Sequence, residues 1–394
     1  MSLDLAITGL GLVTPLGVGR EAVFEGLREP DAATQEAFRG PSSVLEAYDR
    51  AHVAEVWGWD PREHLGARGH RSLDRMTQFM IAAARQTLGD AGLARDGALT
   101  VYDGDRVGLC TATAYGSLDA ISELSRVAEL EDPRYINPTR FPNTVANAAA
   151  GYVAIWEGLR GPNTTMIDGH CGALDCVLNA ATHLRLGRAD ALLVGGAEVL
   201  SEPLYVALAK LGLLRDAHEP ERGLCLGEGA CYLAVERADA AAARGARVLG
   251  KLSGYGSAFE PPARESRLVE ASPDAVSRAV RDALDEAGLA PRDVDAVASS
   301  HADLPALDDA ELAGLRDVFG DDVRVAAPKQ VFGETFGAAG ALGLAAGLAW
   351  LAGCPVAPLV GGGRDVAGER PPRVVVATTV GFYGNASAVA LTAA

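Results

Sequence analysis

The feature that most constrains this chain is a strand–turn–helix unit that occurs twice. Residues 164–167 are compatible with a β-strand and lead into the tight turn Gly169-His170-Cys171-Gly172. Apolar residues then recur at helical spacing, and Ala191-Leu192-Leu193-Val194 is typical of a short buried strand that ends in two glycines. A second unit runs from Val325-Ala326-Ala327 through a glycine turn into an uncharged helix within residues 336–353. This repetition predicts an α/β protein built from two matching halves.

The composition agrees with two closely packed α/β halves, which we place at residues 1–245 and 246–394. Hydrophobic residues make up 48% of the 394 residues but aromatic residues only 6%, so the core is predicted to use small side chains. The uncharged run at 336–353 is about as long as the shortest membrane-spanning helices. Because it is rich in glycine and alanine, we expect a helix buried in a soluble protein instead.

Charge and cysteine usage exclude several classes of function. A net charge of −17 argues against a nucleic-acid or anionic-membrane partner. The first residues, Met1-Ser2-Leu3-Asp4, carry no basic cluster typical of a secretory signal. Six cysteines without paired short spacings indicate a reducing compartment, which we take to be the cytoplasm. We expect no metal site, because the sequence has no Cys-x-x-Cys or His-x-x-x-His pattern. We expect no dinucleotide cofactor, because Thr14 occupies the place of the third fingerprint glycine.

Cys171 is the candidate nucleophile. It lies in a tight turn at the beginning of a helix, where unpaired backbone N–H groups favour the thiolate. The alternative is an ordinary buried cysteine under a helix. The remaining cysteines are predicted to be core residues: Cys110, Cys176, Cys225, Cys231 and Cys354.

The segment around Cys171, together with Gly195-Gly196-Ala197-Glu198, resembles the nucleophile segment of the β-ketoacyl-(acyl carrier protein) synthases. The opening Thr8-Gly9-Leu10-Gly11-Leu12-Val13-Thr14-Pro15 and the later Gly227-Glu228-Gly229 are similar to that family as well. The resemblance covers essentially the whole chain. It implies the thiolase-type fold, in which two duplicated βαβαβ halves form a five-layer αβαβα sandwich, and it implies a dimer with residues 135–150 near the contact.

The resemblance also implies roles for individual residues. Cys171 would accept an acyl group from a carrier thioester, and Lys329 matches the family's lysine. Phe382, in Gly381-Phe382-Tyr383-Gly384-Asn385, would be the gating aromatic, and its N–H would form an oxyanion hole with that of Cys171. Substrate contacts are expected from Ser300, Gly381 and Asn385.

The two family histidines are not both present. Glu334 replaces the second, in Lys329-Gln330-Val331-Phe332-Gly333-Glu334. Ser300 occupies the counted position of the first, with His301 one place later, and a one-residue slip in the loop would restore His301. Glu334 is either protonated by burial, a general base toward another nucleophile, or a structural partner of Lys329 or His301. An ionised carboxylate would repel the enolate that decarboxylation requires.

A basic cluster suggests a site for an acidic partner. In ketosynthases the acidic acyl carrier protein, with its phosphopantetheine-bound substrate, docks near the corresponding segment. We therefore expect docking at Arg62, Arg68, Arg71 and Arg75, although a solvated surface is the alternative. No other cofactor is expected.

Three functions follow. The first is a ketosynthase-like acyltransferase, homodimeric or paired with another ketosynthase, in polyketide or fatty-acid biosynthesis. The second is a non-catalytic partner subunit, because Gly172-Ala173-Leu174-Asp175 and residues 299–311 look similar to chain-length factors. Those ketosynthase-like subunits normally lack the cysteine. The third is a thiolase or hydrolase that acts on free coenzyme A thioesters.

Overall fold

The computed structural model describes residues 3–38, 40–49, 51–215, 223–264, 267–361 and 370–394. Its described strands form one sheet of eleven strands and two small two-stranded sheets. The large sheet runs in the order β13-β12-β14-β15-β11-β1-β10-β8-β6-β7, with β2 paired to β1. The strands are β1 (Leu5–Thr14), β2 (Gly17–Val18), β3 (Val53–Ala54), β4 (Ala94–Arg95), β5 (Ala98–Leu99), β6 (Val107–Ala112), β7 (Asn163–Met166), β8 (Ala191–Glu198), β9 (Leu226–Gly227), β10 (Gly229–Arg237), β11 (Gly250–Phe259), β12 (Ala296–Ala298), β13 (Arg324–Ala326), β14 (Val374–Val380) and β15 (Asn385–Thr392).

The sheet order shows the predicted duplication. On one side β1 pairs antiparallel with β10 and β10 antiparallel with β8, after which β6 and β7 follow in parallel. On the other side β11, β15, β14, β12 and β13 repeat the same sequence of antiparallel and parallel pairings. The two halves join where β1 pairs with β11, at Leu5–Leu252 and the next two residue pairs. The boundary at residue 245 remains a prediction.

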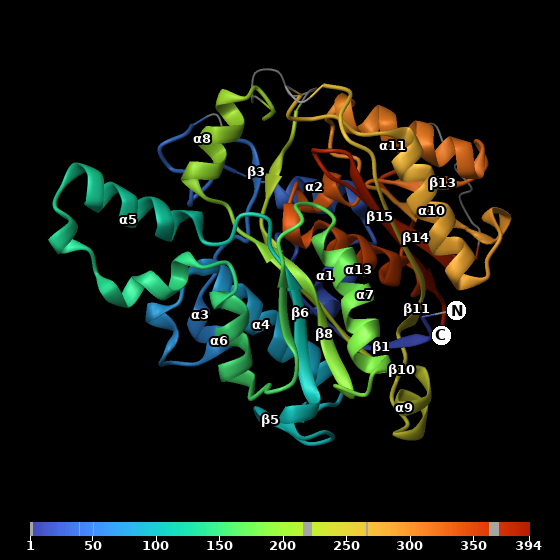
Figure 1. Ribbon diagram of the computed structural model, residues 1–394, viewed down its shortest axis with the longest axis horizontal. Helices are drawn as coiled ribbons and strands as arrows, with labels where there is room; N and C mark the ends of the chain where they lie inside the picture. Colours follow the sequence, from blue (N-terminus) through green and yellow to red (C-terminus); the bar gives the residue numbers. More distant parts are fainter. Residues whose placement is uncertain (1–2, 39, 50, 216–222, 265–266, 362–369) are drawn as a thin grey trace.

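Helices cover both faces of each half and produce the expected layers (Figure 1). α4 and α6 pack outside the first half and α10 and α11 outside the second, while α7 and α13 lie between the halves. The helices are α1 (Arg20–Gly26), α2 (Pro30–Ala37), α3 (Pro61–Leu65), α4 (Arg75–Asp90), α5 (Leu118–Leu130), α6 (Ala148–Glu157), α7 (Gly172–Arg185), α8 (Glu202–Lys210), α9 (Ala238–Ala243), α10 (Pro273–Ala287), α11 (Pro305–Phe319), α12 (Lys329–Phe332) and α13 (Ala339–Leu351).

The uncharged segment forms the central helix α13, which is buried except for its last residue. Its glycines allow close packing, because a Cβ on Gly340 would lie 2.8 Å from Leu174 and one on Gly347 would lie 2.9 Å from Leu391. No helix in the described part of the chain is both long enough and apolar enough to cross a membrane.

The predicted strand at residues 191–194 is longer than expected. β8 continues to Glu198, so Gly195 and Gly196 lie inside the strand and do not end it. Backbone approaches the sheet too closely there for any side chain: a Cβ on Gly195 would lie 1.9 Å from the Cys231 carbonyl oxygen, and one on Gly196 would lie 2.3 Å from that of Gly337.

Candidate functional site

The site begins at the turn between β7 and α7. Gly169 adopts the left-handed conformation, with φ 51°, which lets the chain reverse sharply after the strand. The Cys171 N–H donates to the Asp168 carbonyl oxygen at 3.0 Å, and Cys171 then caps α7. That amide was expected in an oxyanion hole, but the turn already uses its hydrogen.

The Cys171 thiol points into the core. It is 0% exposed, and its Sγ lies 3.7 Å from the Thr379 carbonyl oxygen. Burial, with the Asp175 and Asp168 carboxylates adding to it, raises the pKa of Cys171 from 9.0 to about 12. That change corresponds to about 4 kcal/mol against the thiolate, more than the roughly 0.3–2 kcal/mol that a helix N-terminus contributes in its favour. The setting therefore opposes the activation that the sequence suggested.

His170 occupies the place that was expected for the thiol. Its Nε2 lies 3.3 Å from the Glu334 carboxylate, an ion-pair distance without hydrogen-bond alignment. Its ring contacts those of Phe336 and Phe382, with centroids 5.0 and 4.7 Å away. Successive residues at the beginning of a helix point about 100° apart. A shift of one residue therefore exchanges the side chain that faces Glu334 for the one that faces the core.

Glu334 is one member of a buried ion pair. It accepts from Lys329 Nζ at 2.7 Å and from the Phe336 N–H at 2.7 Å. Burial alone would raise the pKa of Glu334, but Lys329 and His170 outweigh burial and hold that pKa well below its usual range. Of the three possibilities for Glu334, the contacts favour the structural ion pair with Lys329.

The loop does not slip to bring His301 into the site. Lys329 Nζ donates to Ser300 Oγ at 2.9 Å, so Ser300, at the counted position of the first family histidine, is the residue of this loop that contacts the lysine. His301 Nε2 instead lies 3.4 Å from Asp303 and 3.6 Å from Asp308. Burial would lower the pKa of His301, but these carboxylates raise it above its usual value.

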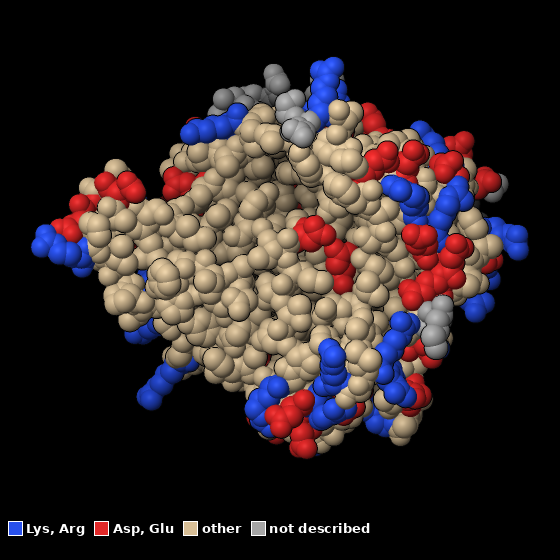
Figure 2. All heavy atoms as spheres, in the orientation of Figure 1, with Lys and Arg blue, Asp and Glu red and all other residues tan. Residues whose placement is uncertain are grey.

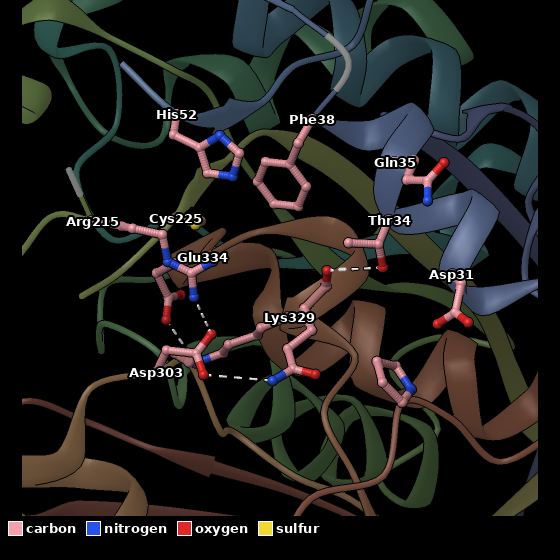
Figure 3. Close-up of a pocket in the computed structure, with 13 residues that line it drawn as sticks. Asp31, Thr34, Gln35, Phe38, His52, Arg215, Cys225, Asp303, Lys329 and Glu334 are labelled. Carbon is pink, nitrogen blue, oxygen red and sulfur yellow. Dashed lines mark hydrogen bonds and ion pairs between the residues drawn. The ribbon is translucent and has the colours of Figure 1, made fainter. Parts of the chain in front are cut away.

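A cavity of about 920 Å³ opens onto the buried ion pair (Figure 3). Lys329 and Glu334 lie at its floor, and Arg215, Asp303, Phe38 and His52 line its walls. Cys225, predicted to be a core residue, also lines it, whereas neither Cys171 nor His170 does. Among the described residues, no group of histidines, cysteines and carboxylates is arranged to hold a metal ion.

The predicted docking arginines differ in exposure. Arg75 is structural: its guanidinium pairs with the fully buried Glu228 carboxylate and lies over the Phe79 ring. Arg62 is exposed but forms an ion pair with Asp60. Of the four predicted arginines, only Arg68 and Arg71 are exposed and have no described ion-pair partner, so the predicted docking patch is reduced to these two residues.

Sequence reasoning missed a carboxyl pair beside Cys171. Asp175 Oδ1 accepts from Tyr255 at 2.7 Å and from Ser387 at 2.6 Å. Asn385, expected to contact substrate, instead donates to Asp168 at 3.1 Å, and its side chain fills the space above Gly381. Burial and the hydrogen bond with the Asp168 carboxyl raise the pKa of Asp175 to about 6. The signal in the sequence was the run that ends in Asp175, which is similar to chain-length factors.

Replacing Asp175 with asparagine is expected to stabilise the protein at pH 8. The folded-state pKa lies above the unfolded value of 3.8, so the wild-type loses stability as the pH rises from about 4 to 7. The shift in the Asp175 pKa between the unfolded and folded states corresponds to a loss of at most about 3 kcal/mol in the free energy of unfolding. Asparagine keeps an oxygen for Tyr255 and Ser387 and gains a donor for Asp168. Urea unfolding at pH 8 and pH 4 measures the effect, and an equal effect at both values would contradict it.

The sequence matches two family models over most of its length. Residues 3–241 match the beta-ketoacyl synthase N-terminal domain, and residues 249–361 match the beta-ketoacyl synthase C-terminal domain. The chain is 32% identical over 382 residues to the tetracenomycin polyketide synthase ketoacyl synthase beta subunit of Streptomyces glaucescens, covering 92% of this chain and 89% of the relative. It is 29% identical over 355 residues to the 3-oxoacyl-[acyl-carrier-protein] synthase 2 of Coxiella burnetii, covering 86% and 83%.

Solved structures show the same fold. The ishigamide ketosynthase/chain length factor superposes with a TM-score of 0.84 at 24% identity, covering 99% of both chains. The ketosynthase ApeO in complex with its chain length factor ApeC, from Xenorhabdus doucetiae, gives 0.81 at 18% identity, covering 99% and 98%. From its two half-domains, its duplicated sheet and these similarities, this chain belongs to the beta-ketoacyl synthase family.

Proposed function

We propose that this chain is a non-condensing partner subunit of a ketosynthase, similar to a chain-length factor. The observation that supports this most is that an imidazole, that of His170, faces Glu334 and Phe382 where a condensing enzyme needs its thiolate. The nearby thiol of Cys171 is fully buried under α7.

The remaining groups are poorly suited to condensation. The reaction needs donors that stabilise an enolate oxygen, but Glu334 is an ionised acceptor and would repel it. Ser300 offers a hydroxyl in place of an imidazole and already accepts a hydrogen bond from Lys329. Loss of one such donor costs roughly 2.7–4 kcal/mol of transition-state stabilisation, so the loss of both would suppress the reaction.

Acyl transfer on Cys171, with Glu334 in place of one histidine, is the second candidate, because the chain is 29% identical to a 3-oxoacyl synthase. It requires the thiol to leave its contact with the Thr379 carbonyl oxygen and rotate out of the core. In either case the substrate would arrive on the phosphopantetheine of an acyl carrier protein, near Arg68 and Arg71. The six cysteines are all free, as a reducing compartment such as the cytoplasm permits.

Intact-protein mass spectrometry distinguishes the partner subunit from the acyltransferase. After incubation with an acyl-carrier protein loaded with an acyl chain, we expect no adduct on this chain. The same assay uses each ketosynthase-family protein of the source organism, co-expressed one at a time, and the adduct should form on that partner.

The functional control is product formation by the heterodimer. Cys171→Ala should leave it within about twofold of wild-type, whereas alanine at the partner's own cysteine should abolish it. An adduct on this chain that disappears in Cys171→Ala would establish the acyltransferase instead. Transfer from free acyl-coenzyme A at an equal rate would favour the third class.

A further inference from the structure

The cavity beside Lys329 has the size of a small-molecule site. Its volume is about 920 Å³, and ligand pockets in proteins typically measure about 300–1,000 Å³. It is lined by α2, α12 and the segments around His52, Arg215 and Asp303. Phe382, which was expected to gate access to Cys171, does not line it. The cavity is therefore distinct from the place where an acyl group on Cys171 would lie.

The surface most suited to contact with a protein involves other elements. Figure 2 shows that the face in front of α6 and α7 carries few charged side chains, as is typical of a surface that another chain covers. No residue of α6 or α7 lines the cavity. Ion pairs and aromatic rings form much of its lining instead, so we consider a small molecule as its ligand.

One wall of the cavity is aromatic. The rings of Phe38 and His52 stack, with centroids 4.8 Å apart and an angle of 14° between their planes. Burial and the nearby Arg215 lower the pKa of His52, so its imidazole is predominantly neutral at pH 7. Figure 3 shows both rings on one side of the cavity, across from Lys329 and Glu334. The stacked rings offer apolar surface to a flat ligand.

The opposite side of the cavity carries two cations that are each paired. Arg215 forms an ion pair with Asp303, and Lys329 forms one with Glu334. A third carboxylate, that of Asp31, is exposed on α2, where water screens its charge. An anionic or cationic ligand would find each opposite charge in the cavity already compensated, and it would still lose its hydration. The charge balance therefore favours a neutral ligand.

Arg215 retains hydrogen-bond donors for such a ligand. A guanidinium carries five N–H groups. Among the described residues Asp303 accepts from Nη2 of Arg215, whereas Nε and Nη1 have no side-chain or backbone acceptor. A carbonyl oxygen on the ligand would fill this place, and hydrogen bonds from a charged donor are among the stronger ones in proteins.

We propose that this cavity binds a neutral, flat molecule with a ring carbonyl. The rings of Phe38 and His52 contact the face of the molecule, and Arg215 donates a hydrogen bond to its carbonyl oxygen. The inference goes beyond the proposed function and does not depend on it, because the cavity contains none of the groups that distinguish a partner subunit from an acyltransferase at Cys171.

The first test compares three ring compounds on the wild-type chain by equilibrium dialysis at pH 7.5. Fluorenone is flat and neutral and has one ring carbonyl, fluorene has a methylene group in its place, and fluorenone carboxylate adds a negative charge. Fluorenone should bind about tenfold more tightly than fluorene, because only fluorenone accepts from Arg215. It should also bind more tightly than the carboxylate. Equal binding of fluorenone and fluorene, tighter binding of the carboxylate, or no binding of fluorenone would each overturn the proposal.

The second test locates the carbonyl. Arg215→Met keeps an unbranched side chain but removes every donor, and Asp303 retains His301 as a partner at 3.4 Å. In this variant fluorenone and fluorene should bind within about twofold of each other. The matched control is Arg281→Met, which removes an arginine paired with Asp317 on the exposed side of α10 and should keep the tenfold preference. An unchanged preference in folded Arg215→Met would contradict the proposal.

The third test locates the rings. Phe38→Leu keeps an apolar side chain but removes the flat surface, so both fluorenone and fluorene should bind about fivefold more weakly. Phe259→Leu, at a phenylalanine that is 58% exposed outside the cavity, should leave both affinities unchanged. Circular dichroism establishes that each variant is folded. If Phe38→Leu binds both compounds as tightly as the wild-type does, the ligand does not lie in this cavity and the proposal is wrong.

Discussion

Replacement of Lys329 with alanine is expected to destabilise the protein by about 3 kcal/mol. The lysine is the main counter-charge of Glu334, which is 1% exposed, and removal of one member of a buried ion pair typically costs about 3–5 kcal/mol. We expect the lower end of this range, because the cavity beside Lys329 admits water to the Glu334 carboxylate that is left without its cation. Urea unfolding followed by circular dichroism at pH 7.5 measures the loss.

The double variant Lys329→Ala/Glu334→Gln provides the decisive control. It leaves no uncompensated charge, so it should be more stable than Lys329→Ala alone. Lys210→Ala, on the exposed end of α8, should stay within about 0.5 kcal/mol of wild-type. A double variant less stable than the single would show that Glu334 does not require its cation.

The ion pair also sets the acid limit of stability. Glu334 has a folded-state pKa below its unfolded value of 4.5, so its contribution is present above that value and is lost as the pH falls through the folded-state pKa. Lys329→Ala removes the main cause of the depressed pKa. The wild-type and the variant should therefore differ most near neutral pH and converge in strong acid.

Replacement of Gly195 with alanine is expected to cost more than about 3 kcal/mol and to prevent soluble expression. The new Cβ would lie 1.9 Å from the Cys231 carbonyl oxygen in the neighbouring strand β10, a distance that no native Cβ contact shows. The obstacle is backbone in the middle of the sheet, so no side-chain rotation relieves it. Expression yield and thermal unfolding report the result.

Gly343→Ala is the matched control. Gly343 lies in α13 and is buried, and apart from the backbone of its own helix no atom lies within 4 Å of the position of a new Cβ. Alanine there removes the entropic cost of a helical glycine and should raise stability by up to about 1 kcal/mol. If both variants fold equally well, the close approach of β8 and β10 is looser than the distances indicate.

Under the proposed function, the family's reactive centre is retained as a structural element. Lys329 and Glu334 form a buried ion pair, His170 and two phenylalanine rings close over it, and Ser300 completes the hydrogen bonds. Charges that would act on a substrate in a condensing enzyme are balanced against one another. Such a centre preserves the shape of the fold, and with it the surface that a partner subunit needs.

The fold was accessible from the sequence because it depends on periodicity. Apolar residues at helical spacing predicted the helix close to α7, and the repeated strand–turn–helix unit predicted the duplicated sheet. The uncharged segment predicted a buried helix because glycine and alanine permit close packing. The close packing of this helix, α13, is with α7 and with strands of both halves, which places it between them.

The site depended on the tertiary structure, because direction and partnership are not local properties. A rotation of about 100° about the helix axis decides whether His170 or Cys171 faces Glu334. The spacing of residues in the turn does not predict that rotation. Arg75 was wrongly predicted to be a docking residue. Its buried partner, Glu228, lies 153 positions away in the chain, so local sequence could not reveal the ion pair. The sequence determined which chemical groups are present, and only the folded chain decided which of them meet.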